Sequence, residues 1–325
     1  MPNVLFSEFG LMGIGLVLIL VAAELLLSLS KQLAARFRLS PLIVSLIIVA
    51  FGTNLPELVV SIASIQQGEA GLALGNLIGS SVVNITLVFA VASLFNSVKL
   101  GNTKTQKNGL ILLSCVVIFV TTQFLGVPAK ITAWLLLGST LVAVTYQLLL
   151  GINGRKAEDR VFMQLVAKLR KRKKVQPLLK QIIYAVLAAA GLWMGGSLTV
   201  ASVTRISDII GVSTTFIGLT ITSLATTLPE LLTVLTASAH KENKVVIGTI
   251  IGSNIFNLTL FPAIIFGFAG SVLISWVEIG LLLAVTCVFV SMLFYFRGKV
   301  VNKFASLGLL SLFFVFIATT LYLQP

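Results

Sequence analysis

The sequence is poor in charged residues and in the side chains that most enzymes need. Only 10% of its 325 residues are charged, whereas 57% are hydrophobic. Its single histidine, His240, and its only aspartates, Asp159 and Asp208, lie in or beside loops between apolar runs. This scarcity excludes an intramembrane aspartyl protease, Ser/His catalysis and most metal-dependent hydrolysis. The cysteines, Cys115 and Cys287, form no metal-binding spacing. We therefore expect neither an enzyme nor a bound cofactor.

Long apolar runs dominate the chain instead. A helix needs about 20 apolar residues to cross a bilayer, and residues 1–8 carry no basic residue of a signal peptide. The sequence predicts an all-α membrane protein with ten transmembrane helices. They span about 9–30, 41–65, 70–96, 109–126, 130–150, 180–204, 213–238, 245–270, 276–296 and 304–323.

The net charge of +13 is distributed by side of the membrane, which argues against nucleic-acid binding. We number the loops between the predicted spans in chain order. Of the 23 Lys and Arg residues, all but Lys130 and Arg205 lie in loops 1, 3, 5, 7 and 9, on one side of the membrane. Because cytoplasmic loops carry the excess of Lys and Arg, both termini are predicted outside and the basic linker 151–179 in the cytoplasm. The short loops and compact size favour a prokaryotic inner membrane.

One motif occurs twice in the chain. The sequence GTNLPE at 52–57 returns as ATTLPE at 225–230. Each acid lies within an apolar run, where a carboxylate is costly and marks a functional site by default. Each also follows a proline, which clashes with the carbonyl four residues earlier. The two helices are therefore predicted to be broken next to Glu57 and Glu230, at the middle of the membrane.

A second polar stretch repeats with the same offset. GNLIGSSVVN at 75–84 is matched by GTIIGSNIFN at 248–257. Ser80 and Asn84 are four residues apart and so share one helix face, as do Ser253 and Asn257. Hydrogen bonding between helices would explain either pair alone, but the repetition favours a binding site.

The repeat divides the chain into two halves with opposite orientation. Residues 1–150 form the first five-helix repeat, 180–325 the second, and 151–179 the linker, with the motif regions at about 41–96 and 213–270. Because five is odd, the second repeat enters the membrane from the other side. Inverted repeats with broken helices and a midplane site are typical of secondary transporters.

The polar groups at these motifs offer only oxygen ligands. They are the carboxylates of Glu57 and Glu230, the side chains of Thr53, Asn54, Ser80, Asn84, Thr226, Thr227, Ser253 and Asn257, and carbonyls freed near the prolines. Such ligands suit Ca²⁺, and also Na⁺ or protons. Two carboxylates balance one divalent or two monovalent cations, as an exchanger requires. Inorganic cations and the lipid bilayer are the expected partners, and a monomer is compatible with the sequence.

These motifs resemble the two alpha-repeats of the cation/calcium antiporter superfamily, in particular its sodium/calcium exchanger branch and the bacterial and archaeal calcium/sodium antiporters. The resemblance covers nearly the whole chain. It implies that Glu57 and Glu230 are the principal cation ligands. Six further side chains would complete four adjoining sites, with carbonyls around Ala50 and Ser223: Thr53, Ser80, Asn84, Thr226, Ser253 and Asn257.

The sequence departs from the family pattern at several positions. Asn54 and Thr227 stand where the family often has Ser, Ser81 where Asn is usual, and Asn257 where some members have Asp. The resemblance implies exchange of Ca²⁺ for Na⁺ by alternating access. A proton-coupled exchanger of Ca²⁺ or another divalent cation is the alternative, and a cation channel a remote one.

Overall fold

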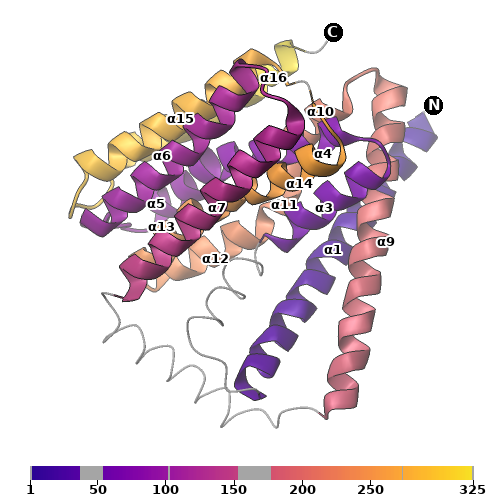
Figure 1. Cartoon of the computed structure of the whole chain (residues 1–325), viewed down its shortest axis with the longest axis horizontal. Coiled ribbons are helices and arrows are strands. Elements are labelled where there is room, and N and C mark those ends of the chain that lie inside the picture. Colours follow the sequence, from indigo (N-terminus) through magenta and orange to yellow (C-terminus); the bar gives the residue numbers. More distant parts are fainter. Residues whose placement is uncertain (1, 37–53, 102, 153–176, 273, 324–325) are drawn as a thin grey trace.

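The computed structural model describes residues 2–36, 54–101, 103–152, 177–272 and 274–323, which are helical apart from turns and one isolated antiparallel bridge between Lys99 and Val300. Within these ranges eight helices are long and apolar enough to cross a membrane, and a ninth if one bent pair is counted as a single span. The predicted span 41–65 is described only in its second part. Figure 1 shows the helices gathered into one bundle, with α1 and α9 along one side.

The helices follow the order of the predicted runs. The first half contains α1 (Pro2–Arg36), α3 (Leu55–Gln66), α4 (Ala70–Val83), the π-helical η1 (Asn84–Phe89), α5 (Ala90–Phe95), α6 (Thr103–Phe124) and α7 (Ala129–Ile152). The second half contains α9 (Leu178–Ile210), α10 (Thr214–Ile217), the π-helical η2 (Gly218–Thr222), α11 (Ser223–Thr226), α12 (Leu228–Ala239), α13 (Asn243–Leu258), α14 (Leu260–Phe268), α15 (Trp276–Tyr295) and α16 (Lys303–Tyr322).

The helices α1 and α9 are longer than the predicted spans 9–30 and 180–204, since α1 extends beyond both ends and α9 continues six residues further. These two helices pack along each other and run in opposite directions (Figure 1). The helix α9 ends only at Gly211, whose φ of 71° caps it in the left-handed region that glycine favours. A methyl group on Gly15 would lie 2.9 Å from the carbonyl oxygen of Gly195. Because Gly15 and Gly195 have no side chains, the two backbones can approach each other closely here.

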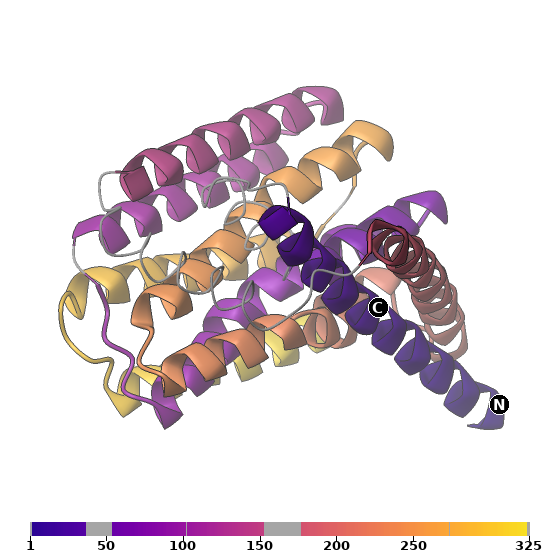
Figure 2. The same ribbon diagram turned by 90° about the horizontal axis from the view of Figure 1, so that it is seen from below.

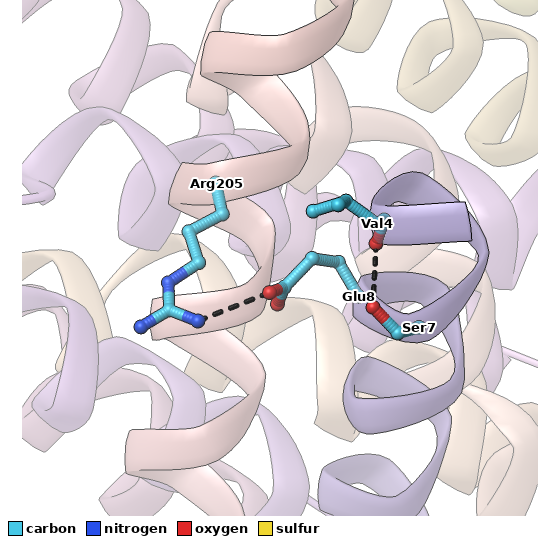
Figure 3. A network of polar contacts seen from close by, with 4 residues as sticks. All are labelled: Val4, Ser7, Glu8 and Arg205. Atoms are coloured by element: carbon cyan, nitrogen blue, oxygen red, sulfur yellow. Dashed lines mark hydrogen bonds and ion pairs between the residues drawn. The ribbon is translucent and has the colours of Figure 1, made fainter. Parts of the chain in front are cut away.

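Polar contacts tie the ends of α1 and α9 together. Figure 3 shows Arg205 on α9 reaching Glu8 on α1, with 3.0 Å between Nη1 and Oε1. The Glu8 side chain is only 6% exposed, whereas that of Arg205 is 67% exposed. Next to Glu8 in the sequence, the hydroxyl of Ser7 donates to the carbonyl of Val4 within α1 at 2.7 Å (Figure 3). Arg205 is one of the two bases on the predicted outer side, and this ion pair gives it a partner.

Among the described residues two spans are interrupted, and only one of these interruptions was predicted. The break predicted next to Glu57 borders residues 37–53, which lie outside the described ranges. The helix pair α10–α11 and α12 is bent by 42° at Thr227, beside Pro229. The second break separates α13 from α14 at Thr259. Pro262 lies three residues beyond that break, and its ring would clash with the carbonyl of Leu258 in a continuous helix. In the first half, Phe89 occupies the position equivalent to Pro262, and the chain continues as η1 and α5 without a break.

The contacts between the two halves follow the repeat: equivalent helices pack on each other, or a contact recurs with the halves exchanged. The helix α1 packs on α9, and α6 packs on α15; α7 lies against α14, and α16 lies against η1 and α5. Viewed from below, the α1/α9 pair again stands to one side of the bundle (Figure 2). The helix α4 lies at the centre, against α10, η2 and α11. A methyl group on Gly79 of α4 would collide with the carbonyl oxygen of Leu219, so this contact also requires glycine.

Three of the loops that were predicted to be cytoplasmic lie within the described residues, and they meet at one end of the bundle. The backbone of Lys99 pairs with that of Val300, and its amide donates to Asn243 Oδ1 at 3.0 Å. Arg297 donates to the hydroxyl of Thr103 at 2.8 Å. The loops that precede α6, α13 and α16 therefore lie together, as the charge pattern requires.

Candidate functional site

The two glutamates of the repeated motif are both fully buried. Glu57 and Glu230 have 0% relative exposure, and each lies in the first turn of a helix, α3 and α12 respectively. The helix N-terminus carries partial positive charge and stabilises a nearby carboxylate. This placement follows from the Leu-Pro-Glu sequence, since proline suits the first turn and puts the acid next to it.

The carboxylates of Glu57 and Glu230 interact with each other although they come from opposite halves of the chain. Glu230, Thr226 and Ser80 are the side chains that act electrostatically on the Glu57 carboxylate. Two like charges placed together in a low-dielectric interior repel each other, and a cation between them removes the repulsion. Two neighbouring buried carboxylates are thus suited to binding a cation.

Hydroxyl groups from both halves meet beside the glutamates. The oxygens of Ser80 on α4 and Thr226 on α11 are 3.3 Å apart, and both residues are fully buried. Thr226 donates to Asn76 Oδ1 at 3.2 Å. Ser80 and Thr226, both predicted ligands, thus lie next to each other in the structure, whereas Asn76 was not among the predicted ligands.

Asparagines form a second contact between the halves. Asn84, at the junction of α4 and η1, donates from Nδ2 to Oδ1 of Asn254 on α13 at 3.4 Å. Among the described residues, Asn84 Oδ1 and both polar side-chain atoms of Asn257 are buried without a hydrogen-bond partner. Buried carbonyl oxygens without donors are costly unless something positive reaches them, so these amides are suited to cation binding.

The remaining predicted residues differ in their surroundings. Ser253 is 3% exposed, and Asn54 and Thr227 are 1% exposed at the starts of α3 and α12. The carbonyl of Ser223 already accepts the Thr227 hydroxyl at 2.6 Å and the Thr226 hydroxyl at 3.4 Å. The two other predicted ligands, Thr53 and the carbonyl of Ala50, lie outside the described residues.

The sequence reasoning missed two polar residues at the site, Asn76 and Asn254. Both are fully buried and both contact a predicted ligand of the opposite half. The repeat contained a signal for them, because the equivalent positions in the other copy, Thr249 and Ser81, are also polar. A search for polar positions shared by both copies, with differing residue types allowed, would have found them.

The arrangement can hold a cation through oxygen atoms but provides few charged ligands. In the described part of the chain no three His, Cys, Asp or Glu side chains are grouped so that they could hold a metal ion. Two carboxylates plus hydroxyl and amide oxygens are instead the ligand types of hard cations. Because both glutamates are sealed from solvent in this conformation, an ion could reach them only through a conformational change.

Comparison with known proteins shows what the chain is similar to. A family model described as "Sodium/calcium exchanger protein" matches residues 7–149 and again residues 180–322. Inner membrane protein YrbG of Escherichia coli is 28% identical over 267 residues, covering 78% of this chain and 79% of the relative. Sodium/calcium exchanger MaX1 of Methanosarcina acetivorans is 23% identical over 282 residues, covering 78% and 81%.

Solved structures give the same fold. The sodium-calcium exchanger NCX_Mj, soaked with 10 mM Na⁺ and 10 mM Sr²⁺, superimposes with a TM-score of 0.62 and 22% identity, over 97% of this chain and 98% of that chain. At 22% identity this likeness shows a shared fold and nothing further. It agrees with the all-helical architecture described above.

Proposed function

This chain belongs to the sodium/calcium exchanger protein family, and we propose on that premise that it exchanges Ca²⁺ for Na⁺ across the membrane as a secondary active antiporter. One observation carries the proposal. Two glutamates from opposite halves of the chain, Glu57 and Glu230, are completely buried in one site among neutral oxygens. Buried carboxylates inside a membrane protein mark an ion pathway by default.

The composition of the site supports a cation of charge two or two cations of charge one. Ca²⁺ takes 6–8 oxygen ligands and accepts carboxylate, hydroxyl and carbonyl oxygens together. We assign Glu57 and Glu230 as the charged ligands. The neutral ligands that we propose are Ser80, Asn84, Thr226, Ser253 and Asn257, supplemented by Asn54, Thr227, Thr53 and the carbonyls of Ala50 and Ser223.

The architecture that we propose is a pair of inverted five-helix repeats with broken helices at the site. Three observations support it. The family model matches each half separately. The helix contacts come in matched pairs, since exchanging the halves converts α7 on α14 into α16 on η1 and α5. The span with Glu230 bends by 42° directly beside it. Such repeats transport by exposing one midplane site alternately to the two sides.

The proposal also includes the orientation of the chain in the membrane and the kind of membrane that holds it. The linker 151–179 lies in the cytoplasm and both termini lie outside, on the strength of the Lys and Arg distribution. Escherichia coli YrbG bears the name of an inner membrane protein, and we assign the same kind of membrane here.

Transport by purified protein in liposomes tests the function. We expect Ca²⁺ uptake driven by an imposed outward Na⁺ gradient, saturating with Ca²⁺ and absent without the counter-ion. Uptake driven by a proton gradient but not by Na⁺ would replace Na⁺ with H⁺ as the coupling ion. Flux that does not saturate and needs no counter-ion would show a channel and contradict antiport.

A further inference from the structure

Two asparagines contact proposed ligands of the opposite repeat. We propose that Asn76 and Asn254 are positioning residues, which orient the hydroxyl of Thr226 and the amide of Asn84 so that their oxygens face the cation. The inference rests on the proposed function, because it concerns the same site. Neither asparagine is assigned as a ligand.

The contact of Asn76 concerns the direction of one proton. A hydroxyl group has one proton and two lone pairs, and it can bind a cation only through a lone pair. Thr226 donates its proton to Asn76 Oδ1 at 3.2 Å. Two other acceptors lie within reach but are farther away. They are the Ser80 hydroxyl oxygen at 3.3 Å and the Ser223 carbonyl at 3.4 Å, which already accepts the Thr227 hydroxyl at 2.6 Å.

When the Thr226 proton is donated to Asn76, it is not donated to the two other neighbours of this hydroxyl, Ser80 and Glu57, and the lone pairs of Thr226 remain free. Without the Asn76 acceptor, the best remaining acceptors for this proton would be the oxygens that should bind the cation. A hydroxyl that donates to Glu57 competes with the ion for the same lone pairs. Asn76 therefore keeps the Thr226 oxygen available.

The contact of Asn254 sets the orientation of an amide. Asn84 donates from Nδ2 to Asn254 Oδ1 at 3.4 Å, and its own Oδ1 is left buried without a donor. If the amide of Asn84 were flipped, so that its oxygen and nitrogen exchanged places, Nδ2 would point towards the cation and repel it. Asn254 Oδ1 accepts the hydrogen bond from Asn84 Nδ2. This bond keeps the nitrogen of the Asn84 amide on the side of Asn254 and its oxygen on the other side.

Both contacts cross between the repeats. Asn76 of the first repeat orients a ligand of the second, and Asn254 of the second orients a ligand of the first. The equivalent positions, Thr249 and Ser81, bear shorter side chains. Ser81 donates to the carbonyl of Leu77 in its own helix at 2.9 Å. The two orienting contacts are thus specific to these positions, and they form only where the repeats are apposed.

The test compares substitutions that remove the acceptor with substitutions that keep it. Asn76→Leu and Asn254→Leu preserve shape and remove the acceptor, whereas Asn76→Asp and Asn254→Asp retain it. Loss of a residue that orients a metal ligand typically weakens metal binding by about 10- to 100-fold. We expect the Leu variants to raise the KM for Ca²⁺ by about this factor, with a much smaller change in maximal rate, because ground-state binding is affected. The Asp variants should bind Ca²⁺ more tightly than their Leu counterparts.

Double substitution distinguishes positioning from a general packing role. If Asn76 acts through Thr226, then Asn76→Leu combined with Thr226→Val should raise KM no more than Thr226→Val alone, because residues that act through one another are not additive. The control is Ser81→Ala, a buried change in the same helix whose hydroxyl donates to its own helix backbone. We expect near wild-type KM for this control.

Direct Ca²⁺ titration of the purified variants, in detergent, supplies a readout independent of transport. Unchanged Ca²⁺ affinity in both Leu variants, equal impairment of the Leu and Asp forms, or full additivity with Thr226→Val would each overturn the positioning role. A wild-type protein that neither binds nor exchanges Ca²⁺ would instead refute the proposed function.

Discussion

The replacement of either buried glutamate by glutamine gives the sharpest test of the site. Glu57→Gln and Glu230→Gln preserve the size of the side chain and an oxygen ligand, and remove one negative charge. Both residues are fully buried, and each acts as the partner of the other in one site. Solvent therefore cannot supply the missing charge, and neither can a neighbouring acid, because no third acid is grouped with the pair in the described part of the chain.

The expected loss follows from the burial of the charge. Removing one partner from a buried set of opposite charges costs about 3–5 kcal/mol. At about 1.4 kcal/mol for each factor of ten, Ca²⁺ affinity should fall by roughly 100-fold to several-thousand-fold. The same substitution relieves the repulsion between Glu57 and Glu230 in the ion-free protein. Each Gln variant should therefore be at least as thermally stable as the wild type without Ca²⁺, and should gain almost no stability when Ca²⁺ is added.

The assay pairs Ca²⁺ uptake into proteoliposomes with thermal unfolding at increasing Ca²⁺ concentration. Ligand binding raises stability only in a protein that binds the ligand, so the two readouts should fail together. Glu278→Gln is the matched control. Like the site glutamates, Glu278 is buried, at 5% exposure, and lies in the first turn of a helix, α15. It differs in that its carboxylate interacts with the backbone of Ser275 rather than with a second acid. Exchange at a normal rate in either site variant, or equal loss in the Glu278 control, would refute the assignment.

Three further outcomes are expected. In a background without Cys115 and Cys287, Lys299→Cys should react only with a membrane-permeant thiol reagent in intact cells, whereas Lys130→Cys should also react with an impermeant one; the reverse result would invert the topology. Arg205→Gln should lower the unfolding free energy by about 1 kcal/mol and Glu8→Gln by less, because only the former leaves the mostly buried Glu8 carboxylate without its partner; calorimetry would show equal losses if packing alone mattered. Asn257→Asp should change the Na⁺ dependence or reversal potential of exchange without abolishing it, and identical values in the variant and the wild type would exclude this position from the charge balance.

Local chemistry and the repeat were enough to predict the central features of the site. The Leu-Pro-Glu sequence places each acid in the first turn of a helix by covalent geometry alone. The constant offset between the two copies links them without any knowledge of their packing. The bend beside Pro229 follows from the proline, and the burial of Glu57 and Glu230 agrees with their position within long apolar runs.

What the sequence could not supply is the register between the two halves. The contacts of Asn76 with Thr226 and of Asn84 with Asn254 depend on how α4 and α13 meet the opposite repeat, and hydrophobic periodicity contains no such information. The break at Thr259 was missed for another reason. Pro262 was visible in the sequence, but the apolar run continues through it, and hydropathy does not respond to the loss of one backbone hydrogen bond.

The site combines a symmetric set of charges with an asymmetric set of neutral groups. Glu57 and Glu230 are equivalent by the repeat, and so are Asn84 and Asn257, so neither half contributes a second acid. Two carboxylates neutralise one Ca²⁺, two Na⁺ or two protons, and a neutral centre crosses a low-dielectric barrier more easily than a charged one. An empty site would retain two bare carboxylates, which opposes reorientation without an ion and so suppresses leak. The asymmetry lies in Asn76 and Asn254, which the repeat does not duplicate, and in Asn54, whose equivalent is Thr227. On the proposed assignment, the two acids set the total positive charge that the site binds. The orientation of the neutral oxygens then determines which cations it prefers.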